Sequence, residues 1–316
     1  MRVSTAFNAI ARPILYSTII MEADKMNPYD TTKGGYQYVP HRTSPDMFEN
    51  VESIKHVIVK YHHYPSEMKG LTMRIFDIDS LRMPKTWLDC PPPCGRCSDE
   101  LGLAIESCLL IRNYRPKKLI VDGARVECGD HHVADTGRLK TLVFRIASDP
   151  SHYSIGWEHI SPPRSPLPSS TAGVSRIVQI FSGFRLYGVQ ERVPSKKYVA
   201  QFASGVGWLM KHHPLVKEFV VVNGRQIHYN ALDLPSSTSH SEREAKFETM
   251  IDDTLCKDAS FKVHHHRDLI SIEYKTRNVD IRFMSLREYL ETHDWSGEFT
   301  EEEAEPWLND DWIEIE

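Results

Sequence analysis

Seven short apolar segments constrain the fold more than any other feature of this sequence. Each is at most six residues long, is rich in β-branched or aromatic side chains and is flanked by polar or turn residues, which is typical of a β-strand. Several are nearly continuous apolar runs, as expected of strands that are covered on both faces of a parallel sheet. The segments are 56–61, 73–78, 118–122, 141–146, 176–181, 218–223 and 280–284, and 16–21 predicts a further short strand.

Amphipathic stretches alternate with these segments. Apolar residues recur at helical spacing in 99–114, 197–213, 242–258 and 286–291. Ser98 and Ser285 are candidate N-caps, and the linker 233–241 should end in the N-cap of a helix at Glu242. Helices that alternate with short strands predict an α/β fold with parallel strand pairing. We therefore expect either an open parallel sheet with flanking helices or an irregular leucine-rich-repeat-like sheet.

Two junctions share one design. The segments 115–122 and 214–223 each follow a predicted helix, contain a proline that stops it, and enter a strand that ends in Asp or Asn. This unit resembles the leucine-rich repeat, in which an asparagine caps the backbone turn after the strand. The repeat would be irregular, because 23, 35 and 42 residues separate the equivalent positions Leu119, Leu142, Ile177 and Phe219.

The first residues carry a second resemblance. The pattern Val3-Ser4-x-x-Phe7-x-x-Ile10-Ala11-x-Pro13-x-Leu15-Tyr16 resembles the last helix of an F-box domain, and the strand after it, in fungal F-box-like proteins. The earlier F-box helices with their Leu-Pro start do not appear. An amphipathic helix that packs on a core is the alternative interpretation. The segment 285–299 resembles the ending of proteins in the same F-box-like group.

These patterns divide the chain into four parts. They are a partial F-box-like helix and strand (1–23), a polar loop (24–50), an α/β domain with an irregular insertion at 147–173 (51–297), and an acidic segment (298–316). The apolar stretch after Met1 is interrupted by polar residues, unlike a signal-peptide core, so we expect the six cysteines to be reduced and the chain to be cytoplasmic or nuclear. Arg2 and Arg12, with no acidic residue before Glu22, make a mitochondrial transit peptide the alternative.

Charge is distributed unevenly along the chain. Of the 43 acidic residues, 12 follow Arg287, the last basic residue, so residues 1–287 carry 38 basic and 31 acidic groups. Thr300 and Glu303 have the spacing of a capping box, and Trp307 and Trp312 lie among the acids. A purely solvated tail would not carry two tryptophans. We expect this segment to dock on the basic body, with presentation of a linear motif to a partner as the alternative.

A structural zinc site is one candidate for chemistry. Cys94 and Cys97 have zinc-knuckle spacing, and Cys128 and His131 have Cys-x-x-His spacing. Three thiolates and an imidazole form a ligand set typical of structural Zn²⁺. The alternative is a proline-rich loop with unrelated thiols and no cofactor.

A metal-dependent hydrolase is the competing hypothesis. Asp77-Ile-Asp79 is expected to follow a strand, and Asp130-His131-His132 lies soon after another. A DxD and a DHH resemble the divalent-metal ligands of the DHH phosphoesterases, in which two metals activate a water. The later glycine- and histidine-rich domain of that family does not appear, and a polar turn is the alternative.

The F-box-like resemblance implies protein–protein recognition rather than catalysis. It implies the substrate-recognition part of a ubiquitin-ligase adaptor, with a cullin–RING ligase adaptor subunit as one partner. Candidate partner-binding residues are Tyr153, Trp157, Trp307 and Trp312. No apolar run approaches the ~18 residues of a membrane span. The positive charge of the body is dispersed, which argues against nucleic acid as a partner.

Overall fold

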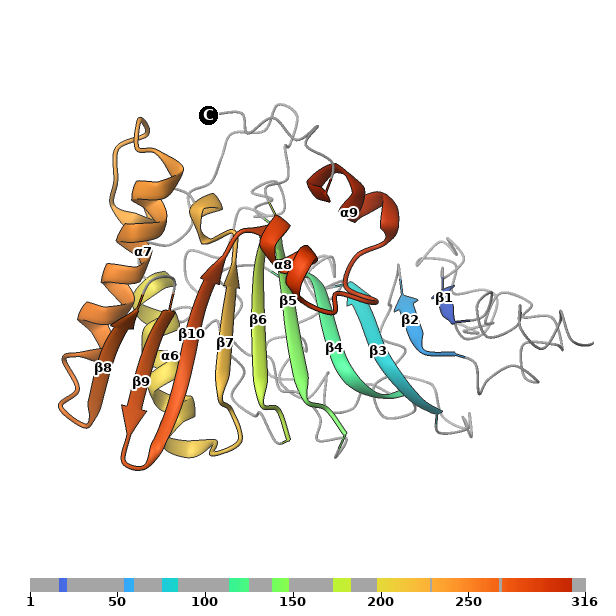
Figure 1. Cartoon of the computed structure of the whole chain (residues 1–316), viewed down its shortest axis with the longest axis horizontal. Coiled ribbons are helices and arrows are strands. Elements are labelled where there is room, and N and C mark those ends of the chain that lie inside the picture. Colours follow the sequence, from blue (N-terminus) through green and yellow to red (C-terminus); the bar gives the residue numbers. More distant parts are fainter. Residues whose placement is uncertain are drawn as a thin grey trace, which may run out of the picture.

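The computed structural model describes residues 17–21, 54–59, 76–84, 114–124, 138–147, 173–182, 198–227, 229–266 and 269–308. Within these residues one ten-stranded sheet has the order β1-β2-β3-β4-β5-β6-β7-β10-β9-β8 (Figure 1). Its strands are β1 (Thr18–Met21), β2 (His56–Val59), β3 (Phe76–Pro84), β4 (Tyr114–Ala124), β5 (Thr141–Ala147), β6 (Arg176–Ser182), β7 (Glu218–Val222), β8 (Phe261–His266), β9 (Leu269–Tyr274) and β10 (Arg277–Met284).

The strands from β1 to β7 lie side by side in the order of the sequence. Each pairs parallel with the next, and β10 joins β7 in parallel before β9 and β8 close the edge as antiparallel strands. In a doubly wound fold the strand order reverses at a switch point, whereas here it does not reverse between β1 and β7. The α/β prediction with parallel pairing is confirmed.

The predicted repeat positions lie in register. Leu119 pairs with Leu142, Leu142 with Ile177, and Ile177 with Phe219, so one lateral row of apolar side chains crosses four strands. The spacings of 23, 35 and 42 residues therefore differ in the connections and leave the register intact. The row continues on both sides through Val57, Leu81 and Ile281.

The bounds of β5, β6 and β7 agree with the sequence patterns to within one residue, whereas other bounds differ. The strand β4 begins four residues before its predicted start, and β10 begins three residues before its own. The predicted strand 73–78 is wrong in extent, because β3 begins at Phe76 and continues to Pro84. The predicted helix 99–114 ends too late, because Tyr114 already belongs to β4; residues 99–113 lie outside the described residues. The strands β8 and β9 were not expected, because β8 contains a lysine and three histidines and one face of β9 carries Ser271 and Glu273.

Two helices cover one face of the sheet, which we call the α6–α7 face. They are α6 (Tyr198–His212) and α7 (His240–Leu255), with the short 3-10 turns η6 (Gly224–Gln226) and η7 (Tyr229–Leu232) beside them. Phe202 and Phe247 are fully buried and pack against each other, and Phe202 also contacts Phe219 of β7. The N-cap of α7 is Ser239, whose capping box with Glu242 starts the helix two residues before the expected cap Ser241.

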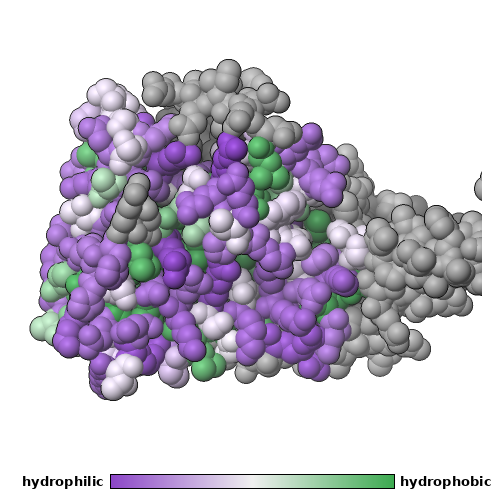
Figure 2. Space-filling model, viewed as in Figure 1, coloured by the Kyte–Doolittle hydropathy of each residue, from purple (hydrophilic) through white to green (hydrophobic). Residues whose placement is uncertain are grey.

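The opposite face carries α8 (Leu286–Thr292) and α9 (Glu301–Leu308), and we call it the α8–α9 face (Figure 1). Beneath these helices the sheet is apolar. Over β8–β10 the same face is hydrophilic and open, with Lys262, His264 and Arg282 exposed (Figure 2). The face is thus divided into a covered apolar part and an open polar part.

Candidate functional site: the carboxyl-terminal segment on the sheet face

The covered part of the α8–α9 face is built from alternate residues of the central strands. Ile120, Val143, Val178 and Val220 form one register row, and each is almost completely buried. Side chains alternate between the faces of a strand, so these residues point away from the row of Leu119 and its neighbours. An apolar surface of this kind has to be covered, and residues 285–308 of the same chain cover it. We call these residues the carboxyl-terminal segment.

The segment starts at two polar contacts that fix its direction. Asn223 at the end of β7 adopts a left-handed conformation with φ 54°, and its Oδ1 accepts a hydrogen bond of 2.8 Å from the backbone of Leu286. Ser285 caps α8 by accepting from the backbone of Glu288. The expected Ser285 cap is therefore present. Asn223 does not cap the turn after its own strand, as the leucine-rich-repeat resemblance predicted; its side chain instead binds the segment that follows the neighbouring strand β10.

Apolar side chains of the segment complete the core on this face. Tyr289, Phe299 and Ala304 are buried, and Trp295 and Trp307 pack on the same cluster while partly buried. The prediction that the acidic end docks on the body is confirmed for the described residues up to 308. Trp307, proposed as a partner contact, is part of this internal packing.

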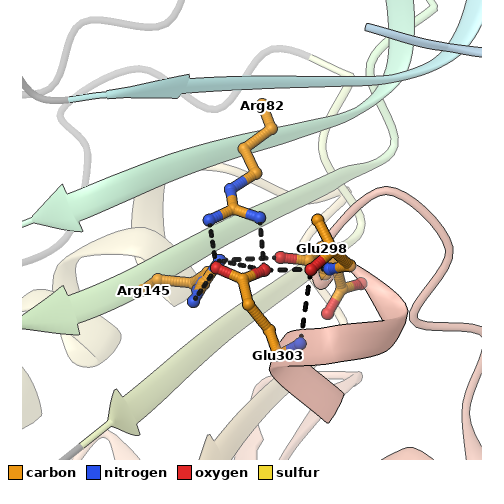
Figure 3. Close-up of polar contacts among 5 residues, drawn as sticks. Arg82, Arg145, Glu298 and Glu303 are labelled. Carbon is orange, nitrogen blue, oxygen red and sulfur yellow. Dashed lines mark hydrogen bonds and ion pairs between the residues drawn. The ribbon is translucent and has the colours of Figure 1, made fainter. Parts of the chain in front are cut away.

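Two arginines hold the start of α9. The Arg82 guanidinium donates two hydrogen bonds to the Glu303 carboxylate, of 2.7 and 2.8 Å (Figure 3). Arg145 donates to the backbone oxygen of Glu298 at 3.0 Å and to both oxygens of Glu303 at 3.3–3.4 Å. Its guanidinium carbon lies 4.6 Å from the centre of the Phe299 ring. Bidentate arginine–carboxylate pairs combine strength with fixed geometry, so this contact fixes the position of the segment.

Glu303 has two roles at once. Its backbone N–H donates to Thr300 Oγ1, while its carboxylate accepts from the Thr300 backbone at 2.9 Å, which is the predicted capping box. Burial would raise the pKa of this carboxyl, but the hydrogen bonds from Arg82 and the charge of Arg145 lower it to about 2. Glu303 is therefore ionised at neutral pH and pairs two sheet cations with the helix.

A buried glutamate and a lysine form the second contact. Lys118 Nζ donates to Glu298 Oε1 at 2.7 Å and to the backbone oxygen of Asp294 at 2.6 Å. Glu298 also accepts a 2.9 Å hydrogen bond from the Tyr289 hydroxyl. Burial raises the pKa of Glu298, and Lys118 opposes this effect. The 294–298 turn thus surrounds one ammonium group of the sheet.

The same turn fits closely over β2 and β3. Gly297 has φ +77°, and a Cβ atom there would lie 1.9 Å from the Ser80 hydroxyl oxygen. Ser80 Oγ lies 2.8 Å from His56 Nδ1, and burial lowers the pKa of His56. A glycine is required at position 297 because it gives both the left-handed conformation and the space.

The two aspartates of the hydrolase hypothesis lie elsewhere than expected. Asp77 and Asp79 lie in the first half of β3 instead of following a strand, because this strand begins at Phe76. Asp77 lies 2.7 Å from Arg138 Nη1, and Asp79 lies 2.7 Å from Lys117 Nζ. The placement at the carboxyl end of a strand is wrong, and both carboxylates already have cationic partners.

The other predicted site residues lie outside the described residues. They are Asp130, His131 and His132 of the hydrolase hypothesis, Cys94, Cys97 and Cys128 of the zinc hypothesis, the partner-contact residues Tyr153, Trp157 and Trp312, and the F-box-like helix. Among the residues that the structure describes, no group of three or more His, Cys, Asp or Glu side chains could hold a metal ion. No helix in this part of the chain is long and apolar enough to cross a membrane.

Sequence reasoning did not find the three cations Arg82, Lys118 and Arg145. Each lies in or beside an apolar strand run, and its side chain points to the face that carries Ile120, Val143 and Val178. A charged residue at an inward position of a strand was the available signal, since such residues are rarely buried unless paired. No family model, curated protein or solved structure matches the chain.

Proposed function

We propose that this chain is a protein–protein recognition module that resembles the substrate-recognition part of an F-box-like ubiquitin-ligase adaptor. The observation that supports this proposal best is the α8–α9 face of the sheet. It holds a peptide segment by two arginines, a lysine and an apolar row, which are groups suited to peptide binding. The open part of the same face offers further charged side chains to a partner.

Strand order gives a second, weaker support. Parallel strands in sequence order place equivalent residues in lateral rows across the sheet. Repeat proteins use such extended surfaces for binding. The resemblance to leucine-rich repeats and to F-box-like proteins implies the same use.

The recognition function is tested on the open part of the face. Lys262→Glu with Arg282→Glu reverses two exposed charges on β8 and β10, while Lys246→Glu on α7 is the control on the opposite face. We expect the full chain to capture a protein partner that the double variant loses and the control retains. If no captured protein depends on the reversed charges, this face is not the recognition surface and the proposal fails.

The ubiquitin-ligase part is tested separately. The purified full chain is mixed with a purified cullin–RING adaptor subunit, and complex formation is measured by size-exclusion chromatography. We expect a complex that is lost when Phe7 and Ile10 of the F-box-like pattern are replaced by Asp. Absence of a complex, even with upstream F-box helices added, would remove the ligase assignment.

A further inference from the structure

Three cations lie on three neighbouring strands of the α8–α9 face. Arg82 belongs to β3, Lys118 to β4 and Arg145 to β5, and these strands are hydrogen-bonded to each other in that order. Arg82 and Arg145 are 7% and 4% exposed, and the Lys118 side chain is 15% exposed. Arg82 pairs in register with Ile120, which pairs with Val143. Lys118 precedes this level by two residues and Arg145 follows it by two, so the three charges form a diagonal row across the face.

The part of the carboxyl-terminal segment that contacts this row consists of two carboxylates with an aromatic ring between them. Glu298 and Glu303 supply two carboxylates, and Phe299 between them supplies a ring that lies over the Arg145 guanidinium. The order is carboxylate, aromatic ring and second carboxylate, with the last at the N-terminus of a helix. A helix N-terminus also favours negative charge.

Buried ion pairs specify a partner more than they add to stability, because desolvation offsets much of the attraction. The folded state would lose stability if the three cations had no carboxylate partners. Replacing one acidic segment by another keeps the cations paired and avoids this loss. The row therefore selects ligands by chemistry without requiring that the ligand belong to the same chain.

On this basis we infer that the α8–α9 face over β3–β5 is a docking site for an acidic partner segment with an aromatic residue between two carboxylates. Residues 298–308 are its resident occupant, and the partner segment displaces them. The inference rests on the proposed recognition function and identifies the class of partner that the face accepts.

Competition with residues 298–308 sets the minimum affinity that a partner segment needs in order to bind. A tethered segment acts at an effective concentration of about 1 mM for a short linker. A partner segment of equal intrinsic affinity competes poorly unless it gains contacts elsewhere. The adjoining open part of the face, with Lys262 and Arg282, can supply such contacts. Selectivity would then require both the acidic–aromatic segment and a complementary neighbouring surface.

The test uses a fluorescein-labelled peptide with the sequence of residues 297–308 and the full-length chain. In the Phe299→Ala/Glu303→Gln variant the resident segment is weakened and the face is otherwise unchanged. Fluorescence anisotropy should show at least tenfold tighter peptide binding to this variant than to the wild type. Adding Arg145→Met should abolish the gain, and a peptide with Gln in place of Glu298 and Glu303 should bind to neither protein.

A second measurement does not depend on that variant folding. Millimolar unmodified peptide is added to the wild-type chain, and hydrogen exchange is followed by mass spectrometry. We expect faster exchange in residues 298–308, because the peptide displaces them. A folded variant that binds the peptide no better than wild type overturns the inference, as does unchanged exchange in the wild type.

The outcomes distinguish this inference from the function on which it rests. If partner capture depends on Lys262 and Arg282 but the peptide does not bind, the acidic docking site is refuted and the recognition function is supported. Peptide binding without any dependent partner would overturn the recognition function and leave a site that binds its own segment alone.

Discussion

Replacing Glu303 by Gln removes one negative charge from the contact between α9 and the sheet. The substitution keeps an amide oxygen that can accept from the Thr300 backbone, so the helix cap persists. The hydrogen bonds from Arg82 and Arg145 lose their charged acceptor. Glu303→Gln therefore isolates the ionic part of the contact.

The magnitude follows from the pKa of Glu303. A pKa of about 2, against an ordinary value of 4.5, corresponds to at most ~3 kcal/mol of stabilisation of the folded state. The side chain is 35% exposed, and solvent screening reduces this figure to ~1–2 kcal/mol. We expect Glu303→Gln to lower the free energy of unfolding at pH 7 by that amount.

The effect should depend on pH in one direction. The folded-state pKa is depressed, so the stabilisation is present above pH 4.5 and is lost as the pH falls from 4.5 to 2. Urea unfolding followed by tryptophan fluorescence at pH 7, 5, 4 and 3 should show wild type and variant converging below pH 4.5. Glu273→Gln is the control, because the partner of Glu273 is the Lys262 side chain, which is 70% exposed, and this variant should shift the unfolding midpoint at pH 7 by less than Glu303→Gln does. An undiminished difference at pH 3, or none at pH 7, would refute the reasoning.

Two further substitutions and one deletion test the contacts that hold the carboxyl-terminal segment on the sheet. Gly297→Ala should lower the free energy of unfolding by ~1–3 kcal/mol, because the added Cβ overlaps the Ser80 hydroxyl. Urea unfolding should show a smaller loss when the same substitution is made in a Ser80→Gly background. Asn223→Ala should lower the free energy of unfolding by ~1–3 kcal/mol, because it leaves the Leu286 N–H without its acceptor. Asn223→Asp keeps an acceptor oxygen and should lower it by less. Equal losses of stability in the two variants would show that this hydrogen bond does not stabilise the fold. Deleting residues 298–316 should lower the melting temperature measured by calorimetry by at least ~5 °C, because burial of Phe299 alone contributes ~2 kcal/mol. An unchanged melting temperature would mean that the segment does not dock on the sheet.

Local signals predicted the local structure well. Ser285 and the Thr300–Glu303 box were found because a capping residue and its helix lie within a few residues of each other. The strand runs were found because β-branched residues cluster between turn residues. The two proline junctions indicated that Leu119 and Phe219 are equivalent positions, but their alignment in one lateral row is shown only by the strand pairing.

Long-range contacts were beyond the reach of the sequence. Arg82 and Glu303 are 221 residues apart, and nothing near either residue indicates the other. The net charges of body and acidic segment predicted docking but did not identify the face or the strands. Asp77 and Asp79 were misplaced because the strand was predicted to end at residue 78, whereas β3 begins at Phe76 and continues to Pro84, so both aspartates lie near its start.

The central claim is that the sheet face recognises the acidic segment through specific ion pairs. A double-mutant cycle between Arg82→Met and Glu303→Gln tests it most directly, because the two residues meet through two hydrogen bonds of 2.7 and 2.8 Å. Urea unfolding at pH 7 of the wild type, both single variants and the double variant gives the coupling free energy. The account predicts a coupling of at least ~1 kcal/mol, within the range for residues in direct contact. Additive effects, with a coupling near zero, would contradict it.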